Sequence, residues 1–410
     1  MKAILSYKKN PNNYFLITIP GSKSESNRLL ILQSLYANLT INNLSTSDDT
    51  QSLIQGLNNN NGTVDIHHAG TAMRFLTAYF ASKESAEITL TGSERMQERP
   101  IKILIDALTN LGADIKYLKN EGYPPIKIKG KLLENSSLKI NANVSSQYIT
   151  ALMLIAPSLN NGLKIELDGE ITSIPYIEMT LDLLQKIGVA CSLSNNCIAI
   201  EPHHKIKDLS IDVESDWSSA SYFYSIVALS EKMEITLKYF RKNSLQGDSE
   251  LAEIYKLLGV ATEFNWADNT ITLKRNDKNI PAFLNLNLNH TPDIAQTIIV
   301  TCFGLGIACK LTGLKTLKIK ETDRLEALDI ELSKLGAICK ITNESIELFS
   351  SSKIKANVLI HTYQDHRMAM AFAPLSLLTT IEIKEPNVVS KSYPTYWEDL
   401  QKIGVGIQIK

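Results

Sequence analysis

Lysine and arginine side chains recur beside the predicted starts of helices. A helix N-terminus carries about half a positive charge, so a cation placed there is locally unfavourable. Six segments share this feature, and their basic residues are Lys23 and Arg28, Arg74, Arg99, Lys320 and Arg324, Arg367, and Lys391. A local rule broken repeatedly in the same way is typical of a functional site. Because backbone N–H groups and added cations together bind anions, the pattern predicts a protein that holds anionic small molecules.

Hydroxyl and amide groups supplement these cations. Ser145, Ser146 and Gln147 precede a predicted helix over 148–159, and their donors suit phosphate oxygens. An ordinary solvated helix cap is the alternative explanation for each segment taken alone.

Acidic neighbours offer a second explanation for one segment. Lys320 and Arg324 flank Glu321 and Asp323, and ion pairs within one helix form at this spacing. The sequence leaves both interpretations of this segment open.

The sequence lacks the motifs that usually bind metal or nucleotide cofactors. The pairs His67-His68 and His203-His204 are adjacent residues, and adjacent side chains on a strand point to opposite faces, so a shared metal is not expected. No metalloprotease, Walker-type or dinucleotide-binding motif occurs in the sequence. We therefore expect neither a metal nor an organic cofactor.

The elements that must position these residues form a repeat. Predicted amphipathic helices end in an apolar residue, followed by glycine, then Ala or Val, then an alternating strand. The glycines are Gly112, Gly188, Gly259, Gly336 and Gly404. Glycine adopts the left-handed conformation that ends a helix at low cost. With a sixth unit expected near 50–66, the sequence predicts about six α/β units, three in each of two domains.

Length, charge and cysteine content narrow the class of protein. A chain of 410 residues exceeds one ordinary core, so two domains are expected. The net charge of −1 argues against a nucleic-acid-binding protein. Five cysteines without a C-x-x-C pair indicate neither a disulfide framework nor a zinc site, and favour the cytoplasm. We see no signal peptide and no apolar stretch of the ~20 residues that span a membrane.

Taken in order, these segments resemble the 5-enolpyruvylshikimate-3-phosphate synthase family, also called the 3-phosphoshikimate 1-carboxyvinyltransferases. Each motif is moderately specific, and the ordered set is very specific. The segments are residues 20–28, 69–74, 95–101, 145–147, 173–176, 216–220, 243–248, 289–293, 320–324, 365–370 and Lys391. They span nearly the whole chain.

The resemblance implies a fold and a reaction. The family has two inside-out α/β barrel-like domains, each of three βαβαββ-type repeats, joined by two crossovers with the active site in the interdomain cleft. Here the discontinuous domain would comprise residues 1–19 and 216–410, and the inserted domain residues 20–215. The enzymes move the enolpyruvyl group of phosphoenolpyruvate to the 5-hydroxyl of 3-phosphoshikimate and release phosphate, without a cofactor. This is a step of the shikimate pathway to chorismate and the aromatic amino acids.

The resemblance also assigns residues to each substrate. Those for phosphoenolpyruvate are Lys23, Gly70, Arg99, Gln147, Arg324, Arg367 and Lys391. Those for 3-phosphoshikimate are Lys23, Ser24, Arg28, Ser145, Ser146, Gln147, Ser173, Tyr176, Asp293, Thr316 and Lys320. Asp293 would accept the proton of the 5-hydroxyl, Glu321 would shuttle a proton, and Lys23 would assist the departing phosphate. The division of acid and base roles among these three stays open. These two small molecules are the expected partners of a monomer, without nucleic acid or membrane.

Three positions depart from the family pattern. His68 stands where Asn is common, Phe75 where Pro is frequent, and Thr316 where an Asn commonly binds substrate. These changes bear on substrate affinity and inhibitor response. Gly70 predicts sensitivity to glyphosate, because an alanine there would crowd that inhibitor.

Three other classes of protein compete with this interpretation. The UDP-N-acetylglucosamine enolpyruvyl transferases use a loop cysteine as acid, and none of the five cysteines here sits in an Arg-rich loop. RNA 3′-phosphate cyclases need a nucleotide and a basic surface, against which the net charge argues. A non-catalytic two-lobed anion-binding protein would gain nothing from Asp293 and Glu321.

Overall fold

The computed structural model describes residues 1–9, 12–141, 145–169, 171, 174–276, 280–350 and 353–410. The chain divides into two compact units. The inserted unit contains Gly21–Val213, and the split unit contains Met1–Pro20 together with Glu214–Lys410. The chain thus passes between the units after Pro20 and after Val213, whereas the sequence placed these crossings after residues 19 and 215.

The inserted unit is built from short strands and seven helices among its described residues. Its strands are β3 (Leu39–Asn42), β4 (Asn61–Asp65), β5 (Glu87–Thr91), β6 (Asp114–Tyr117), β7 (Ile126–Lys129), β8 (Ser137–Asn141), β9 (Leu163–Asp168), β10 (Cys191–Ser194), β11 (Cys197–Ile200) and β12 (Leu209–Asp212). Its helices are α1 (Lys23–Leu35), α2 (Asp48–Leu57), α3 (Gly70–Ser82), α4 (Glu94–Gln97), α5 (Lys102–Asn110), α6 (Ser146–Ile155) and α7 (Ile174–Lys186), with a 3₁₀ turn η1 (Ala156–Ser158).

The split unit combines the two ends of the chain. Its strands are β1 (Lys2–Tyr7), β2 (Tyr14–Ile17), β13 (Glu234–Lys238), β14 (Val260–Asn265), β15 (Thr270–Arg275), β16 (Phe283–Asn287), β17 (Ala308–Thr312), β18 (Ile338–Ile341), β19 (Ile346–Phe349), β20 (Val358–Ile360), β21 (Ile381–Lys384) and β22 (Val405–Ile409). Its helices are α8 (Trp217–Leu229), α9 (Leu251–Leu257), α10 (Ala295–Leu305), α11 (Arg324–Leu335), α12 (His366–Phe372) and α13 (Tyr396–Lys402). Its 3₁₀ turns are η2 (Gly247–Glu250), η3 (Pro292–Ile294), η4 (Lys315–Ile319), η5 (Ala373–Leu377) and η6 (Pro386–Lys391).

The strands of the described residues form six sheets, three in each unit. Five sheets have four strands and share one topology, in which two parallel strands are followed by two antiparallel ones. The order β4-β5-β7-β6 is an example, with β4 and β5 parallel and the other two pairings antiparallel. The sixth sheet pairs β3 with β12 in parallel. The predicted count of three repeats per domain therefore matches the three sheets of each unit.

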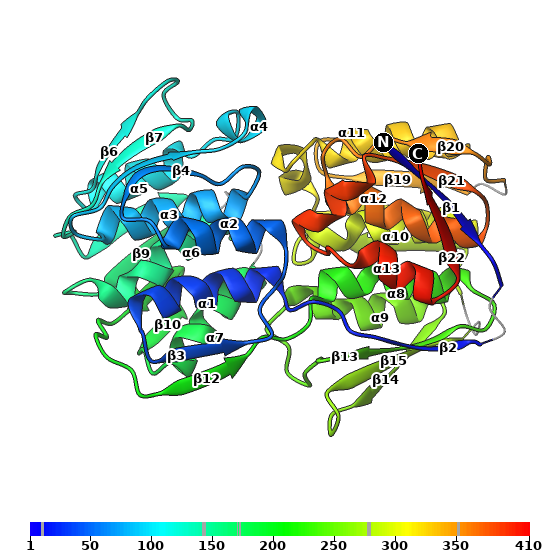
Figure 1. The fold of residues 1–410 in the computed structure, drawn as a ribbon, viewed down its shortest axis with the longest axis horizontal. Helices are drawn as coiled ribbons and strands as arrows, with labels where there is room; N and C mark the ends of the chain where they lie inside the picture. Colours follow the sequence, from blue (N-terminus) through cyan, green and yellow to red (C-terminus); the bar gives the residue numbers. More distant parts are fainter. Residues whose placement is uncertain (10–11, 142–144, 170, 172–173, 277–279, 351–352) are drawn as a thin grey trace. The chain divides into compact units, whose positions relative to one another are not determined.

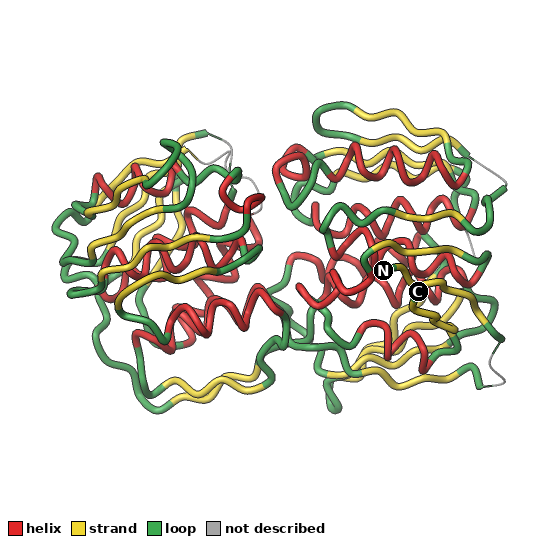
Figure 2. The backbone as a smooth tube through the Cα atoms, turned by 45° about the horizontal axis from the view of Figure 1, so that its top comes forward, coloured by secondary structure: helices red, strands yellow, loops and turns green. Residues whose placement is uncertain are grey.

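Burial places the helices inside each unit and the sheets outside. Helix α8 buries 12 of its 13 residues and α3 buries 11 of 13, as expected for helices that are apolar on all sides. In β9 the burial alternates residue by residue, so one face packs on the helices and the other faces solvent. In the inserted unit β6 and β7 lie toward one edge and β3 and β12 toward the opposite one, with α1, α3 and α6 between them (Figure 1). Figure 2 shows the same arrangement with strands in yellow and helices in red.

The glycines predicted to end helices do so. Gly112, Gly188, Gly259, Gly336 and Gly404 have φ values of 106°, 93°, 80°, 104° and 102°. This left-handed region is the one that favours glycine. The sixth unit has no such glycine at this point, because α2 ends at Leu57 and the next residue, Asn58, keeps a right-handed helical conformation. Among the helices described, none is long and apolar enough to cross a membrane.

Candidate active site

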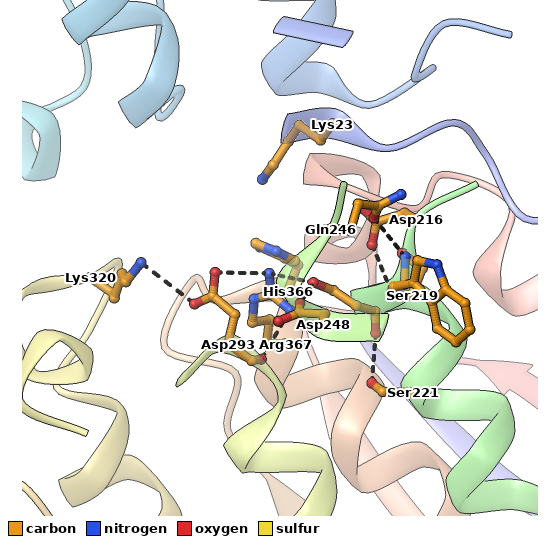
Figure 3. Close-up of polar contacts among 12 residues, drawn as sticks. Lys23, Asp216, Ser219, Ser221, Gln246, Asp248, Asp293, Lys320, His366 and Arg367 are labelled. Carbon is orange, nitrogen blue, oxygen red and sulfur yellow. Dashed lines mark hydrogen bonds and ion pairs between the residues drawn. The ribbon is translucent and has the colours of Figure 1, made fainter. Parts of the chain in front are cut away.

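Asp293 lies in η3 and is surrounded by three cations of the split unit. Its Oδ1 atom is 2.9 Å from Nη1 of Arg324 and 3.5 Å from Nζ of Lys320. Its Oδ2 atom is 3.4 Å from Nη2 of Arg367 (Figure 3). Burial alone would raise the pKa of Asp293, but Lys320, Arg367 and Arg324 together hold it well below its usual range. Asp293 is therefore a carboxylate at neutral pH. We call Asp293, Lys320, Glu321, Arg324 and Arg367 the Asp293 cluster.

Arg324 connects three acidic side chains within the split unit. Its guanidinium lies 2.9 Å from Asp293, 2.8 Å from Glu321 and 2.7 Å from Asp365. Its side chain is only 2% exposed. Burial would lower the pKa of Arg324, but the three carboxylates raise it above its usual value. An ion pair between Arg324 and Glu321 is thus present, but Glu321 lies before α11, so the pair is not one within a helix as that interpretation expected.

Aspartates cap the two helices that carry the arginines of the cluster. Asp323 caps α11 by accepting from the backbone N–H of Leu325 and Glu326 at 3.1 and 3.2 Å. Asp365 caps α12 by accepting from the backbone N–H of Arg367 at 2.8 Å. These carboxylates offset the helix dipole. Part of the compensation that we expected from bound anion therefore comes from the protein itself.

Lys23 is the first residue of α1 in the inserted unit. Its Nζ atom is 3.0 Å from Oδ2 of Asp49, and both side chains are largely buried. Asp49 lies in the first turn of α2, where an acidic residue is normal. For this reason the sequence did not single it out as a partner of Lys23.

Two arginines do not lie at helix starts, which corrects the sequence-based prediction. Because α1 begins at Lys23 and α3 at Gly70, Arg28 and Arg74 lie in the second turns. Both are 3% exposed. Arg74 donates to the backbone oxygens of Gly70 and Pro100 at 3.3 and 2.9 Å.

The prediction for Lys391 also needs correction. Lys391 ends η6, and the next helix, α13, begins only at Tyr396. Its Nζ atom donates to the backbone oxygen of Gln364 at 2.7 Å. Tyr363 and Gln364 both have left-handed backbones, with φ of 53° and 56°. Glu331 supports this pair by accepting from the hydroxyl of Tyr363 at 2.5 Å. The support comes from residues far apart in the sequence, which gave no signal for it.

Arg28 is enclosed by polar and aromatic groups of the inserted unit. It donates to Thr180 at 2.9 Å, to the backbone oxygen of Ser24 at 2.7 Å, to Thr150 at 3.3 Å and to the backbone oxygen of Tyr176 at 3.2 Å. The rings of Phe75 and Tyr176 lie 5.8 and 5.7 Å from its Cζ atom. Burial lowers the pKa of Arg28 to about 10. Phe75, one of the departures from the family pattern, thus supplies a cation–π contact.

Gly70 and Arg99 are in direct contact. A Cβ atom built on Gly70 would lie 2.4 Å from Nη1 of Arg99. The Nε atom of Arg99 is buried and has no hydrogen-bond partner among the described residues. His68, two residues before Gly70, shares a 2.8 Å hydrogen bond between its Nδ1 atom and the hydroxyl of Ser93. The lack of a Cβ at position 70 allows the guanidinium to rest on the start of α3.

The start of α6 lies beside the start of α3. Ser145 caps α6 by accepting from the backbone N–H of Gln147 at 3.4 Å. The side chain of Gln147 donates to Thr71 at 3.1 Å. Tyr148 donates to the backbone oxygen of Pro100 at 2.6 Å. Because Thr71 directly follows Gly70 in the sequence, this hydrogen bond places Gln147 near Gly70 in space. Ser146 is buried, and Ser173 lies outside the described residues.

Thr316 presents a buried polar atom without a partner. Its Oγ1 atom has no hydrogen-bond partner among the described residues. Thr316 lies in η4, which ends one residue before Lys320. A buried hydroxyl without a partner is unusual, and this position is the one that the resemblance assigned to 3-phosphoshikimate.

Fold and site together define an α/β protein of two units, in each of which cationic side chains gather beside carboxylates or hydroxyl groups. A family model described as EPSP synthase (3-phosphoshikimate 1-carboxyvinyltransferase) matches residues 55–400. The chain belongs to this family, which confirms the resemblance.

Individual relatives agree with the family. The chain is 48% identical over 398 residues to a 3-phosphoshikimate 1-carboxyvinyltransferase of Bacteroides fragilis, covering 96% of both chains. It is 36% identical to the enzyme of that name from Colwellia psychrerythraea, covering 94% of this chain and 96% of the relative. A solved EPSP synthase from Acinetobacter baumannii has a TM-score of 0.77 with 19% identity, and each chain is covered in full. That likeness confirms the predicted α/β fold.

Proposed function

We propose that the protein transfers the enolpyruvyl group of phosphoenolpyruvate to the 5-hydroxyl of 3-phosphoshikimate and releases phosphate. This reaction belongs to the shikimate pathway, which leads to chorismate and the aromatic amino acids. Membership of the EPSP synthase family supports it. The observation that carries it is the Asp293 carboxylate with Lys320, Arg324 and Arg367 within 3.5 Å. Such a group can take a proton while nearby cations stabilise a developing anion.

Phosphoenolpyruvate is assigned to cations of both units. Lys23 and Arg99 belong to the inserted unit, and Arg324, Arg367 and Lys391 to the split unit. Gly70 allows close approach of the backbone, and Gln147 adds an amide donor. Because Arg324 already contacts three carboxylates, an incoming carboxylate must replace part of these contacts.

3-Phosphoshikimate is assigned mainly to the inserted unit. Ser24, Arg28 and Tyr176 bind its carboxylate. Its phosphate is assigned to Ser145, Ser146, Ser173 and Lys320. Thr316 and Asp293 bind its ring hydroxyls, with Gln147 and Lys23 adjoining both substrates. The contacts of Arg28 with Ser24 and Tyr176 support the grouping of these three residues.

The reaction proceeds by addition and elimination. The 5-hydroxyl oxygen attacks C2 of phosphoenolpyruvate, and Asp293 takes the hydroxyl proton. Glu321, which is paired with Arg324, must first gain a proton, and it then passes this proton to the methylene carbon. The adduct then loses phosphate from C2 and a proton from its new methyl group, which restores the double bond. Lys23 assists the departing phosphate, and Glu321 takes back the proton.

Substrate binding must change the basicity of Asp293. A base works best when its pKa lies near the working pH, yet three cations hold the pKa of Asp293 far below that range. Lys320 and Arg367 are both assigned to substrate anions. When these anions offset the charges of the two cations, the pKa of Asp293 rises. Asp293 thus becomes an effective base only when both substrates are bound.

Phosphate release tests the proposal. Purified protein is mixed with phosphoenolpyruvate and either 3-phosphoshikimate or UDP-N-acetylglucosamine. Release only with 3-phosphoshikimate is the expected result. Release only with the nucleotide sugar would replace the acceptor, and release with neither would contradict the proposal.

The protein is further proposed to act as a monomer in the cytoplasm. Its five cysteines are free thiols, which supports a reducing compartment. Sedimentation equilibrium with and without substrates tests the oligomeric state, and a stable dimer would contradict this part.

A further inference from the structure

Ser218 connects Arg367 with a buried carboxyl group that the reaction does not use. The Nη2 atom of Arg367 lies 3.4 Å from the hydroxyl oxygen of Ser218. That hydroxyl donates a short hydrogen bond to Oδ2 of Asp248. Figure 3 shows Asp248 beside Arg367 and Asp293. Asp248 is 5% exposed. Ser218 and Asp248 belong to segments that carry the family resemblance but received no role from it.

The direction of the serine hydroxyl depends on Asp248. A hydroxyl group has one proton to donate and lone pairs to accept with. Because the proton of Ser218 goes to Asp248, a lone pair is left for the guanidinium of Arg367. Without an acceptor at position 248, the hydroxyl can rotate and turn its proton toward the cation.

Arg367 needs a contact that does not depend on Asp293. Its Nη1 atom donates to the backbone oxygen of Asp293 at 3.1 Å, and its Nη2 atom is 3.4 Å from Oδ2 of Asp293. In the proposed reaction Asp293 takes a proton and loses its charge. The ion pair with Arg367 then weakens, whereas the contact through Ser218 is unaffected by that proton.

Both ends of this connection are held by one buried amide. Gln246 accepts from the backbone N–H of Trp217 at 2.9 Å, directly before Ser218. It donates to the backbone oxygen of Ser215 at 2.8 Å and to Glu214 at 3.3 Å. Gln246 is 6% exposed and lies two residues before Asp248. The amide therefore fixes the spacing between the start of α8 and η2.

We propose that Asp248 is a positioning residue that acts through Ser218 to hold the Arg367 guanidinium in place for the phosphoenolpyruvate anion. The inference rests on the proposed function. It assigns the side chains of η2 and the start of α8 to one task, which is to keep a substrate-binding cation in place during proton transfer at Asp293.

The charge of Asp248 gives the proposal a pH-dependent signature. The charged groups that act on it are Asp293, Arg367 and Asp216. Burial and then Asp293 raise the pKa of Asp248 to about 7, against the opposing effect of Arg367. Below that pH Asp248 is neutral, and Arg367 presents its full charge to an anion. Above it the carboxylate offsets this charge, so the KM for phosphoenolpyruvate rises with pH.

Four variants test the proposal by steady-state kinetics at about pH 6 and about pH 8, on either side of this pKa. Asp248→Ala and Ser218→Ala are expected to raise the KM for phosphoenolpyruvate about tenfold, with kcat and the KM for 3-phosphoshikimate within about twofold of wild type. Asp248→Asn keeps an acceptor but cannot ionise, so its KM should rise less with pH. Ser225→Ala is the control, because Ser225 lies on the same helix and bonds to Thr301 at 2.7 Å.

Several outcomes would overturn the proposal. One is an unchanged KM for phosphoenolpyruvate in folded Ser218→Ala, and another is an equal rise in KM for both substrates. A pH profile of Asp248→Asn identical to wild type also counts against it. If Asp248→Ala does not fold, the KM values of Ser218→Ala and Asp248→Asn decide whether the proposal holds. If wild-type protein shows no turnover, the proposed function fails instead, and calorimetric binding of phosphoenolpyruvate to the same variants decides this inference.

Discussion

Arg99 occupies the space into which a side chain on Gly70 would project. The position of a Cβ atom on Gly70 is 2.4 Å from Nη1 and 2.9 Å from Cζ of Arg99. Both residues are assigned to phosphoenolpyruvate. Any substituent at position 70 therefore acts on the ligand in two ways, by its own volume and by moving the guanidinium.

Gly70→Ala should weaken the binding of both phosphoenolpyruvate and glyphosate. Displacing Arg99 loses a charged hydrogen bond, so we expect the KM for phosphoenolpyruvate to rise about tenfold. Inhibition by glyphosate, expected to compete with phosphoenolpyruvate in the wild type, should fall by at least as much. The KM for 3-phosphoshikimate should not change. Initial-rate kinetics of Gly70→Ala beside Arg99→Lys measure both effects, and unchanged glyphosate inhibition in Gly70→Ala would refute the prediction.

Asp293→Asn should lower activity and stability through one lost charge. Loss of the base is expected to reduce kcat by about 10²-fold or more. The change also leaves Lys320 and Arg367 without this counter-ion, at a cost of up to about 3 kcal/mol. Added phosphate should restore part of the stability by supplying an anion to these cations.

Urea unfolding with and without phosphate measures the second effect of Asp293→Asn. Glu326→Gln is the matched control, because Glu326 is an exposed acidic residue in the first turn of α11. A kcat close to wild type in Asp293→Asn would contradict the assignment of the base.

Thr316→Asn should improve the affinity for 3-phosphoshikimate. The buried hydroxyl of Thr316 has no partner among the described residues, and an amide reaches farther toward a ligand. One added hydrogen bond corresponds to a KM for 3-phosphoshikimate lower by about fivefold. Thr316→Val removes the hydroxyl at equal volume and should raise that KM. If neither variant changes it, position 316 does not bind substrate.

Tyr363→Phe should loosen the backbone that Lys391 contacts. A left-handed conformation costs a residue other than glycine about 1–3 kcal/mol, and the hydroxyl of Tyr363 anchors its pair with Gln364 to Glu331. We expect a loss of about 1 kcal/mol in the free energy of unfolding and a higher KM for phosphoenolpyruvate. Tyr123→Phe, at a tyrosine that is 37% exposed, is the control. Equal KM values in the two variants would show that the anchor does not serve Lys391.

Local features of the sequence determined the architecture of this protein. The five helix-ending glycines depend on their own backbone conformation and on the residues next to them, so their spacing predicted the repeats. Helix boundaries were predicted less well, because Arg28 and Arg74 were taken for residues at a helix start. In the structure both arginines lie one turn farther into their helices. They are buried by packing against α6, α7 and the loop at Pro100, and this packing depends on the tertiary structure.

The sequence also identified the cations, but only the tertiary structure decided which groups they contact. The partners of Asp293 lie far along the chain, with Arg324 31 residues and Arg367 74 residues away. Asp49 gave no signal, and Asp365 and Asp248 lie in segments of the family resemblance but received no role from it, because a carboxylate at a helix start or in a turn is unremarkable by itself. Ion pairs and pKa shifts depend on distance and burial in space. The chemistry of each group therefore follows from the fold, while the residue types that make it possible are present in the sequence.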